Sequence, residues 1–354
     1  MKTATTIRLN PQNMMKTIHT LLALTAIGLP MILSAADPRT LISSLENVPA
    51  AEIHFYQLRD NDGRGVDCLK VFQPADGKSA GVYYGLYHNQ QKGVLSAHLA
   101  RSEDLRVWKH VAVLDEHASQ PTVWLCDNGA CLVAYEKDKP NACWMRIRYY
   151  GNLADLSTGK HARAFDIERT LAPTAEGTPS FESVTIGKNG MDTSQIQLRF
   201  HYFKNAQVDQ LARGTLTDFK VWKAEPSDTI NAERVKQGWH GNLGDRDRFV
   251  WQGDVYYLQE IQRVKGDWSS WRICLCAKDS MPVHTLAITT HKASTAFANP
   301  NATWVTDANN QRKLVVTLFL PSEGNHSSEA GTLLYVINPT ESLHLPSKEM
   351  KATP

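Results

Sequence analysis

The sequence predicts an all-β chain that forms a five-bladed β-propeller as a single domain, with its ring closed by an N-terminal strand. Short β-rich runs bounded by Gly, Asn, Asp and Pro recur along the whole chain, and few windows show a sustained helical period. These runs also follow one another in a fixed, repeating order. Repeats of about 50 residues or more, each containing several strands, are typical of propellers.

Two kinds of strand alternate in this repeat. The apolar kind occupies residues 81–88, 130–136, 196–203, 254–261 and 313–320. Most of these runs follow a stretch with a polar start and an apolar end, at residues 118–124, 177–184, 244–251 and 298–305. Within those stretches Pro121, Pro179, Asp247 and Pro300 occupy comparable places, at spacings of 58, 68 and 53 residues. A third element repeats at 100–108 and 212–222, where the two tryptophans are 114 residues apart.

Five blades account for these repeats. The first, degenerate at its start, covers roughly 60–112, and the last has only three strands, ending at 332–337. Residues 52–58 are therefore expected to supply its outer strand. Because 42% of the 354 residues are hydrophobic and no Pro/Gly/Ser-rich linker interrupts the chain, we expect one domain over residues 37–354. An irregular β-sandwich or barrel with accidental spacing is the alternative.

The N-terminal residues 1–36 read as a signal peptide. Lys16 precedes the apolar run 20–33, and small residues at Ser34 to Ala36 suit cleavage after Ala36. The alternative is a membrane anchor, although 14 apolar residues are short for a span. We expect a secreted or periplasmic monomer with no membrane span after cleavage. The mature chain has 35 basic and 36 acidic residues, which argues against a nucleic-acid partner.

The six cysteines do not have the spacing of a zinc site. Cys126 and Cys131 flank a turn sequence, so a disulfide across a hairpin and a pair of small buried thiols both remain open. We expect no cofactor and no catalytic metal. A structural calcium ion in the central channel stays an option, although no EF-hand loop is present.

Polar residues fall where a propeller would gather them. The inner strand of each blade starts at the face where the second strand ends, so residues at these two places converge on one pocket. The second strands offer His88, Glu136, His201 and Glu260. The inner strands offer Asp67, His117, Gln120, Glu176, Glu182, Asp245, Arg246, Asp247 and Asn299.

This mixture of carboxylates, histidines, amides and one arginine suits a sugar ligand. Glycosidic hydrolysis needs one protonated and one ionised carboxyl group. Arg246 between two aspartates would keep both charged, which favours Glu176 as the acid, with Glu182 next. The predicted catalytic set is Asp67, Glu176, Asp245 and Asp247. The predicted substrate-binding set is His88, His117, Gln120, Glu136, His201, Arg246, Glu260 and Asn299.

Structural roles compete with these. Strand-end carboxylates such as Glu136, Glu182 and Asp67 often accept backbone N–H groups. Asp245 to Asp247 would serve equally as an ion-pair clamp between blades. If the site interpretation holds, Asp247→Asn abolishes turnover and leaves the fold intact.

The chain resembles the five-bladed propellers of glycoside hydrolase families 43, 32 and 68, through "RD" before an apolar strand, "GDVYYL" and "SEDLRVW" (102–108). Those enzymes act on arabinans, xylans and fructans. The resemblance implies a base at Asp67, an aspartate in the second blade, and an acid at Glu176 or Glu182. The second blade departs from this pattern, because it offers Gln120 and the aspartate pair lies in the fourth blade.

The sequence therefore favours a secreted glycoside hydrolase that acts on a plant or algal polysaccharide or oligosaccharide. Two alternatives remain. A polysaccharide lyase would use His201 or His88 as base, a tyrosine as acid and Arg246 against a uronate. A non-catalytic glycan-binding propeller would need only the amides and tryptophans.

Overall fold

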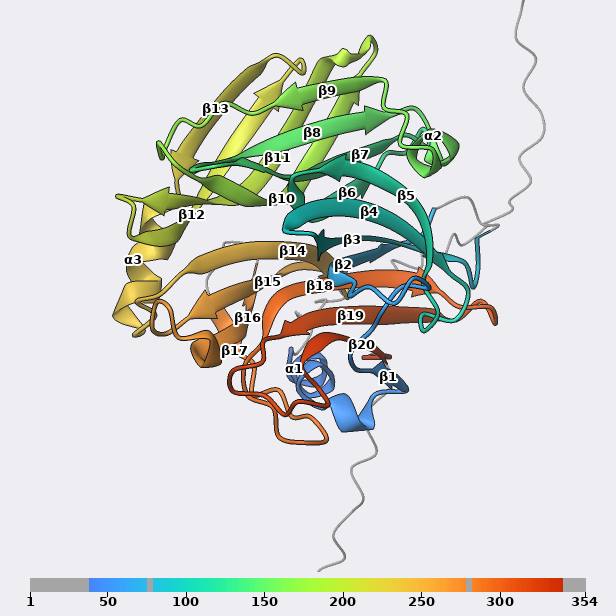
Figure 1. The fold of residues 1–354 in the computed structure, drawn as a ribbon, viewed down its shortest axis with the longest axis vertical. Coiled ribbons are helices and arrows are strands. Elements are labelled where there is room, and N and C mark those ends of the chain that lie inside the picture. Colours follow the sequence, from blue (N-terminus) through green and yellow to red (C-terminus); the bar gives the residue numbers. More distant parts are fainter. Residues whose placement is uncertain (1–37, 75–78, 278–281, 340–354) are drawn as a thin grey trace, which may run out of the picture. The chain divides into compact units, whose positions relative to one another are not determined.

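Five four-stranded antiparallel sheets build the fold (Figure 1). The computed structural model describes residues 38–74, 79–277 and 282–339, except for the side chains of Asp245, Pro282 and Val283. The predicted signal peptide, residues 1–36, lies outside the described residues. None of the helices in the described ranges is long and apolar enough to cross a membrane.

Each sheet forms one blade. Within a blade the strands are given from the innermost to the outermost, which in the first four blades is also their order in the chain. The first consists of β2 (Asp67–Phe72), β3 (Tyr83–Gln91), β4 (Val94–Ser102) and β5 (Lys109–Glu116). The second consists of β6 (Ala118–Leu125), β7 (Cys131–Lys139), β8 (Ala142–Tyr150) and β9 (Arg163–Asp166). The third consists of β10 (Glu176–Gly187), β11 (Gly190–Lys204), β12 (Val208–Thr217) and β13 (Val221–Pro226).

The last two blades follow the same plan. The fourth consists of β14 (Leu243–Trp251), β15 (Asp254–Gln262), β16 (Trp271–Ala277) and β17 (Pro282–Thr285). The fifth consists of β18 (Ala298–Thr306), β19 (Arg312–Leu320), β20 (Gly331–Ile337) and, from the start of the chain, β1 (Ile53–Phe55). Each inner strand contacts the next one, and β18 contacts β2, so the five inner strands form a closed ring.

The N-terminal strand closes the ring as predicted. In Figure 1 β1 lies beside β20, and the two pair antiparallel, with Ile53 opposite Val336 and Phe55 opposite Leu334. The five predicted second strands, and the inner strands predicted for the last four blades, overlap the observed strands. The five-bladed, all-β prediction is therefore confirmed.

Apolar side chains between neighbouring sheets form the core, because each strand turns alternate residues toward each face of its sheet. Leu258 and Leu275 of the fourth blade pack in one cluster with Val316 and Leu333 of the fifth. The sequence did not predict the helices, which are short: α1 (Arg39–Glu46), α2 (Leu153–Ser157), α3 (Asp228–Lys236) and the 3₁₀ turns η1 (Val48–Ala50) and η2 (Trp268–Ser270).

Candidate functional site

An irregularity near the start of every inner strand shapes the centre of the propeller. The register between inner and second strands shifts in all five blades, and the shift brings one residue of each inner strand to an equivalent position. We call these residues the bulge ring: Cys68, Gln120, Thr178, Arg246 and Asn299. Four of them, all except Arg246, have left-handed backbone φ angles of 58°, 53°, 49° and 47°. Such angles are costly for residues other than glycine and persist only where neighbouring groups hold them.

Side chains at the ends of the second strands provide that support. The backbone N–H of Gln120 donates to His88 Nδ1 at 3.2 Å, from the second blade to the first. The N–H groups of Thr178 and Asn299 donate in the same way, at 2.6 Å each, to Glu136 and Glu260 of the preceding blades. These three contacts, the bulge clamps, join one blade to the next. They occupy one acceptor of each of three side chains that the sequence predicted to bind substrate.

Arg246 lies at the centre of this arrangement. It is 1% exposed and its Nη2 donates to the sulfur of Cys68. The Cys68 thiol in turn donates to Gln120 Oε1 at 2.9 Å, so three blades meet through these side chains. Nε and Nη1 of Arg246 have no hydrogen-bond partner within the described part of the chain.

Burial and neighbouring charges control protonation here. Burial raises the pKa of Cys68 to about 12, against the opposing effect of Arg246, so this thiol is not a nucleophile at neutral pH. Burial lowers the pKa of His88 to about 4. The His88 ring is therefore neutral, and because Nδ1 accepts a hydrogen bond, its proton is on Nε2.

Two carboxyl groups of the centre are shifted toward the protonated form. Burial raises the pKa of Asp67, opposed by the Thr332 hydroxyl, which donates to Oδ1 at 3.1 Å. Burial also raises the pKa of Glu260, which is 6% exposed, while Arg246 acts in the opposite direction. The charge of Arg246 lowers the pKa of the Cys68 thiol, and the charges of Glu260, Glu136 and Asp67, from the fourth, second and first blades, raise it.

The structure separates the predicted Asp245-Arg246-Asp247 group. Asp247 is 5% exposed, and its Oδ2 accepts from Lys70 Nζ at 2.6 Å and from the Ala302 N–H at 2.8 Å. It is thus a buried ion-pair clamp between blades, the structural alternative that the sequence left open. The side chain of Asp245 lies outside the described part of the structure, and its predicted role stays a prediction.

Glu176, the predicted acid, anchors a loop. It is 1% exposed, and its Oε1 accepts the backbone N–H groups of Thr170 at 2.7 Å, of Leu171, and of Ala172 at 3.0 Å. These three residues lie between β9 and β10. The carboxyl group is therefore turned toward its own loop.

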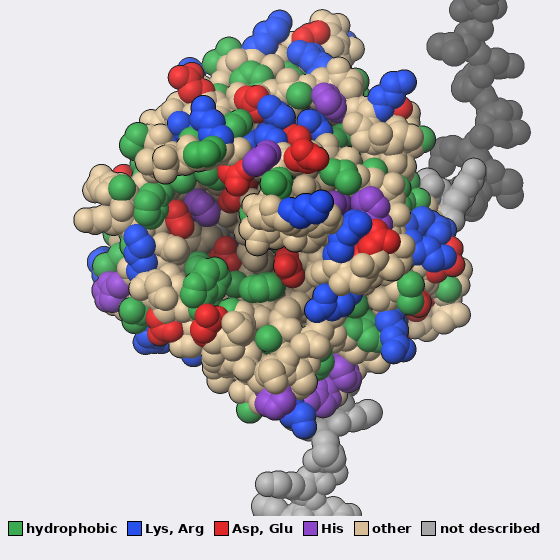
Figure 2. All heavy atoms as spheres, in the orientation of Figure 1, with side chains coloured by type: hydrophobic (Ala, Val, Ile, Leu, Met, Phe, Trp, Pro, Cys, Tyr) green, Lys and Arg blue, Asp and Glu red, His purple; other side chains and the backbone are tan. Residues whose placement is uncertain are grey.

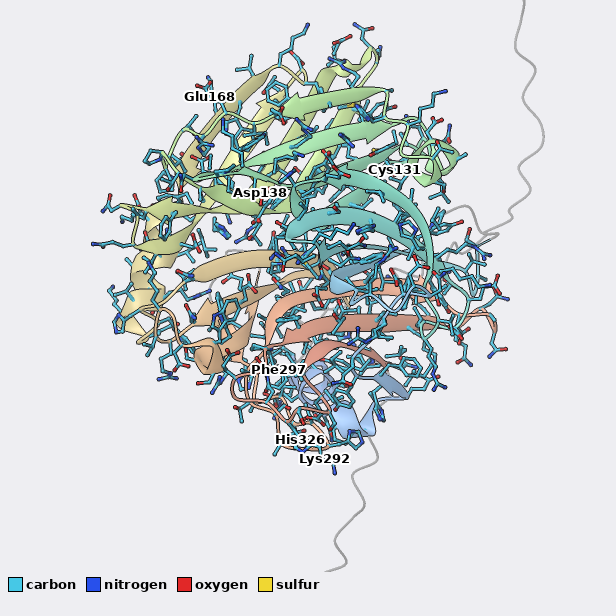
Figure 3. All side chains as sticks on the ribbon, viewed as in Figure 1. Cys131, Asp138, Glu168, Lys292, Phe297 and His326 are labelled. Atoms are coloured by element: carbon cyan, nitrogen blue, oxygen red, sulfur yellow. The ribbon has the colours of Figure 1, made fainter. Side chains whose placement is uncertain are left out.

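Two His–Asp pairs lie near the ends of the second strands. His117 Nδ1 is 3.2 Å from Asp138 Oδ1, and His201 Nε2 is 3.8 Å from Asp209 Oδ1. The His117 pair is half exposed. Figure 2 shows a hollow on this side of the propeller, between the β10–β12 and β14 segments of Figure 1, with acidic and histidine side chains around it. Asp138, labelled in Figure 3, lies next to this hollow.

Sequence reasoning missed Cys68 and Lys70. Cys68 was treated only as a thiol, although it directly follows Asp67 as Gln120 follows Ser119 at the same register shift one blade later. Lys70 is a charged residue in an otherwise apolar inner strand, and a buried lysine requires a partner. A lysine within an apolar run could therefore have identified Lys70 from the sequence, but it does not identify Asp247 as the partner.

The described residues form neither a candidate metal site nor a disulfide bond. Among the residues it describes, no group of three or more His, Cys, Asp or Glu side chains is placed to hold a metal ion. The calcium option stays untested. All six cysteines are free thiols, including Cys126 and Cys131.

Comparison with known proteins finds similarity in structure and none in sequence. No protein-family model matches the chain, and no curated protein matches it. A proposed glycosidase from Bacteroides thetaiotaomicron matches at 8% identity and a TM-score of 0.50, over 81% of this chain and 89% of that one. A thermostable family-43 glycoside hydrolase matches at 10% identity and 0.49, over 81% and 90%. The Cellvibrio cellulosa α-L-arabinanase, solved with arabinohexaose, matches at 11% identity and 0.48, over 77% and 91%. The resemblance expected from the sequence is thus confirmed for the fold: the five-bladed chain has the same fold as the Bacteroides protein.

Proposed function

We propose that the protein hydrolyses O-glycosidic bonds in a plant or algal polysaccharide or oligosaccharide. One observation carries the proposal: Asp67, Glu136 and Glu260 come from three blades to the bulge ring. Asp67 directly precedes Cys68, and the two glutamates accept the N–H groups of Thr178 and Asn299. Carboxyl groups with different environments, arranged around a central pocket, are what acid–base cleavage of a glycoside requires. The signal-peptide pattern of residues 1–36 supports action outside the cytoplasm.

Asp67 is the group that we assign to activation of water. It begins the inner strand of the first blade and is partly exposed, unlike Asp247 and Glu176. Among the described residues, its side chain accepts one hydrogen bond, from the Thr332 hydroxyl to Oδ1, so Oδ2 is available for a water molecule. The Gln120 amide contacts Cys68, the residue after Asp67, and the His88 ring contacts Gln120; their N–H groups suit sugar hydroxyls.

A non-catalytic glycan-binding propeller is the second candidate. The observation that favours it is the commitment of Asp247 and Glu176 to internal hydrogen bonds, which leaves fewer carboxyl groups for chemistry. Such a protein would bind the same saccharides and release nothing.

The test is a polysaccharide panel of arabinan, xylan, fructan, pectin and alginate. We expect reducing sugar to appear without an unsaturated product, because hydrolysis adds water across the bond. Asp67→Asn should lower kcat/KM by about 10²- to 10⁴-fold, the usual contribution of one acid–base group. Exposed Glu103, whose carboxylate pairs only with Arg101 among the described residues, supplies the control Glu103→Gln, which should keep full activity.

Three results would contradict the proposal. An ultraviolet-absorbing unsaturated product would favour the lyase. Binding of a panel member without any product would favour the glycan-binding propeller. Equal activity of Asp67→Asn and the wild type would remove Asp67 from the mechanism.

A further inference from the structure

Glu136 and Glu260 occupy equivalent positions two blades apart. Each lies near the end of a second strand and opposite an inner-strand residue, Ser119 for Glu136 and Gly244 for Glu260. Each also accepts the N–H of the next blade's bulge-ring residue, at 2.6 Å. The propeller therefore presents the same side chain twice, in the same structural role.

Their remaining hydrogen bonds differ. Glu136 has both oxygens occupied, because Oε1 also accepts from the Thr178 hydroxyl at 3.0 Å and Oε2 accepts from the Ser119 hydroxyl at 2.8 Å. For Glu260, the described residues supply one bond only, the Asn299 N–H on Oε2. Its Oε1 lies over Gly244, where a Cβ atom would overlap that oxygen. A glycine at this point therefore makes room for the carboxyl group.

The surroundings differ as well. Arg246, whose Nε and Nη1 find no hydrogen-bond partner among the described residues, acts on Glu260, and so do the charges of His201 and Glu136. Glu260 is almost fully buried, and burial favours its neutral, proton-bearing form. A carboxyl group with a free oxygen and a bound proton can donate that proton, whereas one whose two oxygens already accept three hydrogen bonds is held as a structural element.

We propose that Glu260 is the general acid of the hydrolysis proposed above, an assignment that rests on that function. Its proton passes to the glycosidic oxygen as the bond from that oxygen to the anomeric carbon breaks, and the leaving sugar departs as an alcohol. The oxygen of water bonds to the anomeric carbon, and the water proton passes to Asp67. Proton exchange with solvent then restores both carboxyl groups.

Glu260→Gln and Glu136→Gln form a matched pair for the test, since glutamine keeps the volume and can still accept the backbone N–H. Both variants are assayed on the polysaccharide that the wild type cleaves and on the 2,4-dinitrophenyl glycoside of the sugar it releases. Dinitrophenolate leaves without protonation, so this substrate does not need an acid. We expect Glu260→Gln to lose about 10²- to 10⁴-fold on the polysaccharide and less than about tenfold on the aryl glycoside. The alkaline limb of the kcat/KM pH profile should also disappear.

A purely structural Glu260 gives a different pattern. Glu260→Gln would then lose activity equally on both substrates, as we expect for Glu136→Gln, and would keep the alkaline limb; either result overturns the assignment while the hydrolase proposal stands. Activity on the aryl glycoside also reports that the variant is folded. A wild type that cleaves no member of the panel overturns the hydrolase proposal and the acid assignment together.

Discussion

At the scale of single residues, neighbours in the chain have separate tasks. Arg246 and Asp247 are adjacent, yet Arg246 reaches Cys68 in the bulge ring while Asp247 reaches Lys70 and Ala302. The register shift between Asp245 and Asp247 leaves Arg246 without an opposite residue, so the two neighbours have different surroundings. The charged triplet therefore combines a central group with a clamp.

Asp247→Asn should lower the free energy of unfolding by about 3–5 kcal/mol, because it leaves the Lys70 ammonium buried without its carboxylate. Urea-induced unfolding measures this loss. The double variant Lys70→Met/Asp247→Asn should be more stable than Asp247→Asn alone, since both charges are then gone and the asparagine still accepts the Ala302 N–H.

The control is the exposed Arg163–Asp192 pair, whose side chains are 33% and 59% exposed. Asp192→Asn should cost less than about 1 kcal/mol. Unchanged stability of Asp247→Asn would show that the pair contributes nothing. It would also restore the sequence-based expectation that this substitution leaves the fold intact.

At the scale of elements, a bulge in one blade and a side chain from the blade before it work as a unit. Thr178 has a left-handed backbone, which is rare for a β-branched residue, and Glu136 holds its N–H and its hydroxyl. Gly177 provides the space, because a Cβ atom there would overlap Glu136 Oε1. The strained backbone therefore lies in the third blade, and the carboxylate that offsets the strain lies in the second.

Gly177→Ala should lower the free energy of unfolding by about 1–3 kcal/mol, because the new methyl group displaces the Glu136 carboxylate. In a Glu136→Ala background the same change should cost clearly less. A double-mutant cycle of denaturation midpoints measures this coupling. Additive effects would mean that Gly177 does not serve the clamp.

The pairing of a bulge with a side chain from the preceding blade also limits how much of the site the sequence can predict. Repeats and apolar runs located the strands, the blade count and the closing strand, because alternation and turn residues are local signals. The bulge is not local. It decides that Thr178 and Arg246, and not Asp247, join the ring, and it is fixed by partners 42 residues away, as for Thr178 and Glu136. The loop that Glu176 anchors escaped prediction for the same reason, since a strand pattern does not show which backbone N–H groups a carboxyl group accepts.

At the scale of the whole molecule, stability depends on ring closure. Neighbouring blades follow one another in the chain, except where the fifth blade contacts the first. The fifth blade is completed only by β1, whose Ile53 and Phe55 are partly buried against the cluster that contains Leu334 and Val336. A weak β1 would leave β20 as an unpaired edge.

Ile53→Ser/Phe55→Ser should lower the free energy of unfolding by about 2–4 kcal/mol, because it removes apolar contacts at the closing strand. Thermal and urea unfolding measure the loss. Val111→Ser/Val113→Ser is the matched control on β5, an outer strand that closes nothing and whose valines are 37% and 49% exposed. That pair should cost less than about 1 kcal/mol. Equal losses in the two pairs would mean that closure adds no stability of its own.

The closing strand also determines the order in which the blades can be completed during synthesis. A ribosome makes β1 before every other strand of the propeller and makes its partner β20 last. Four blades can assemble from contiguous segments as they emerge, but the fifth must wait for strands separated by almost 280 residues. A nascent chain interrupted just before residue 331 already contains every inner strand and every bulge-ring residue, but it lacks the partner of β1. It also lacks Thr332, so the hydrogen bond on the Asp67 carboxyl group forms only once synthesis has reached the final strand.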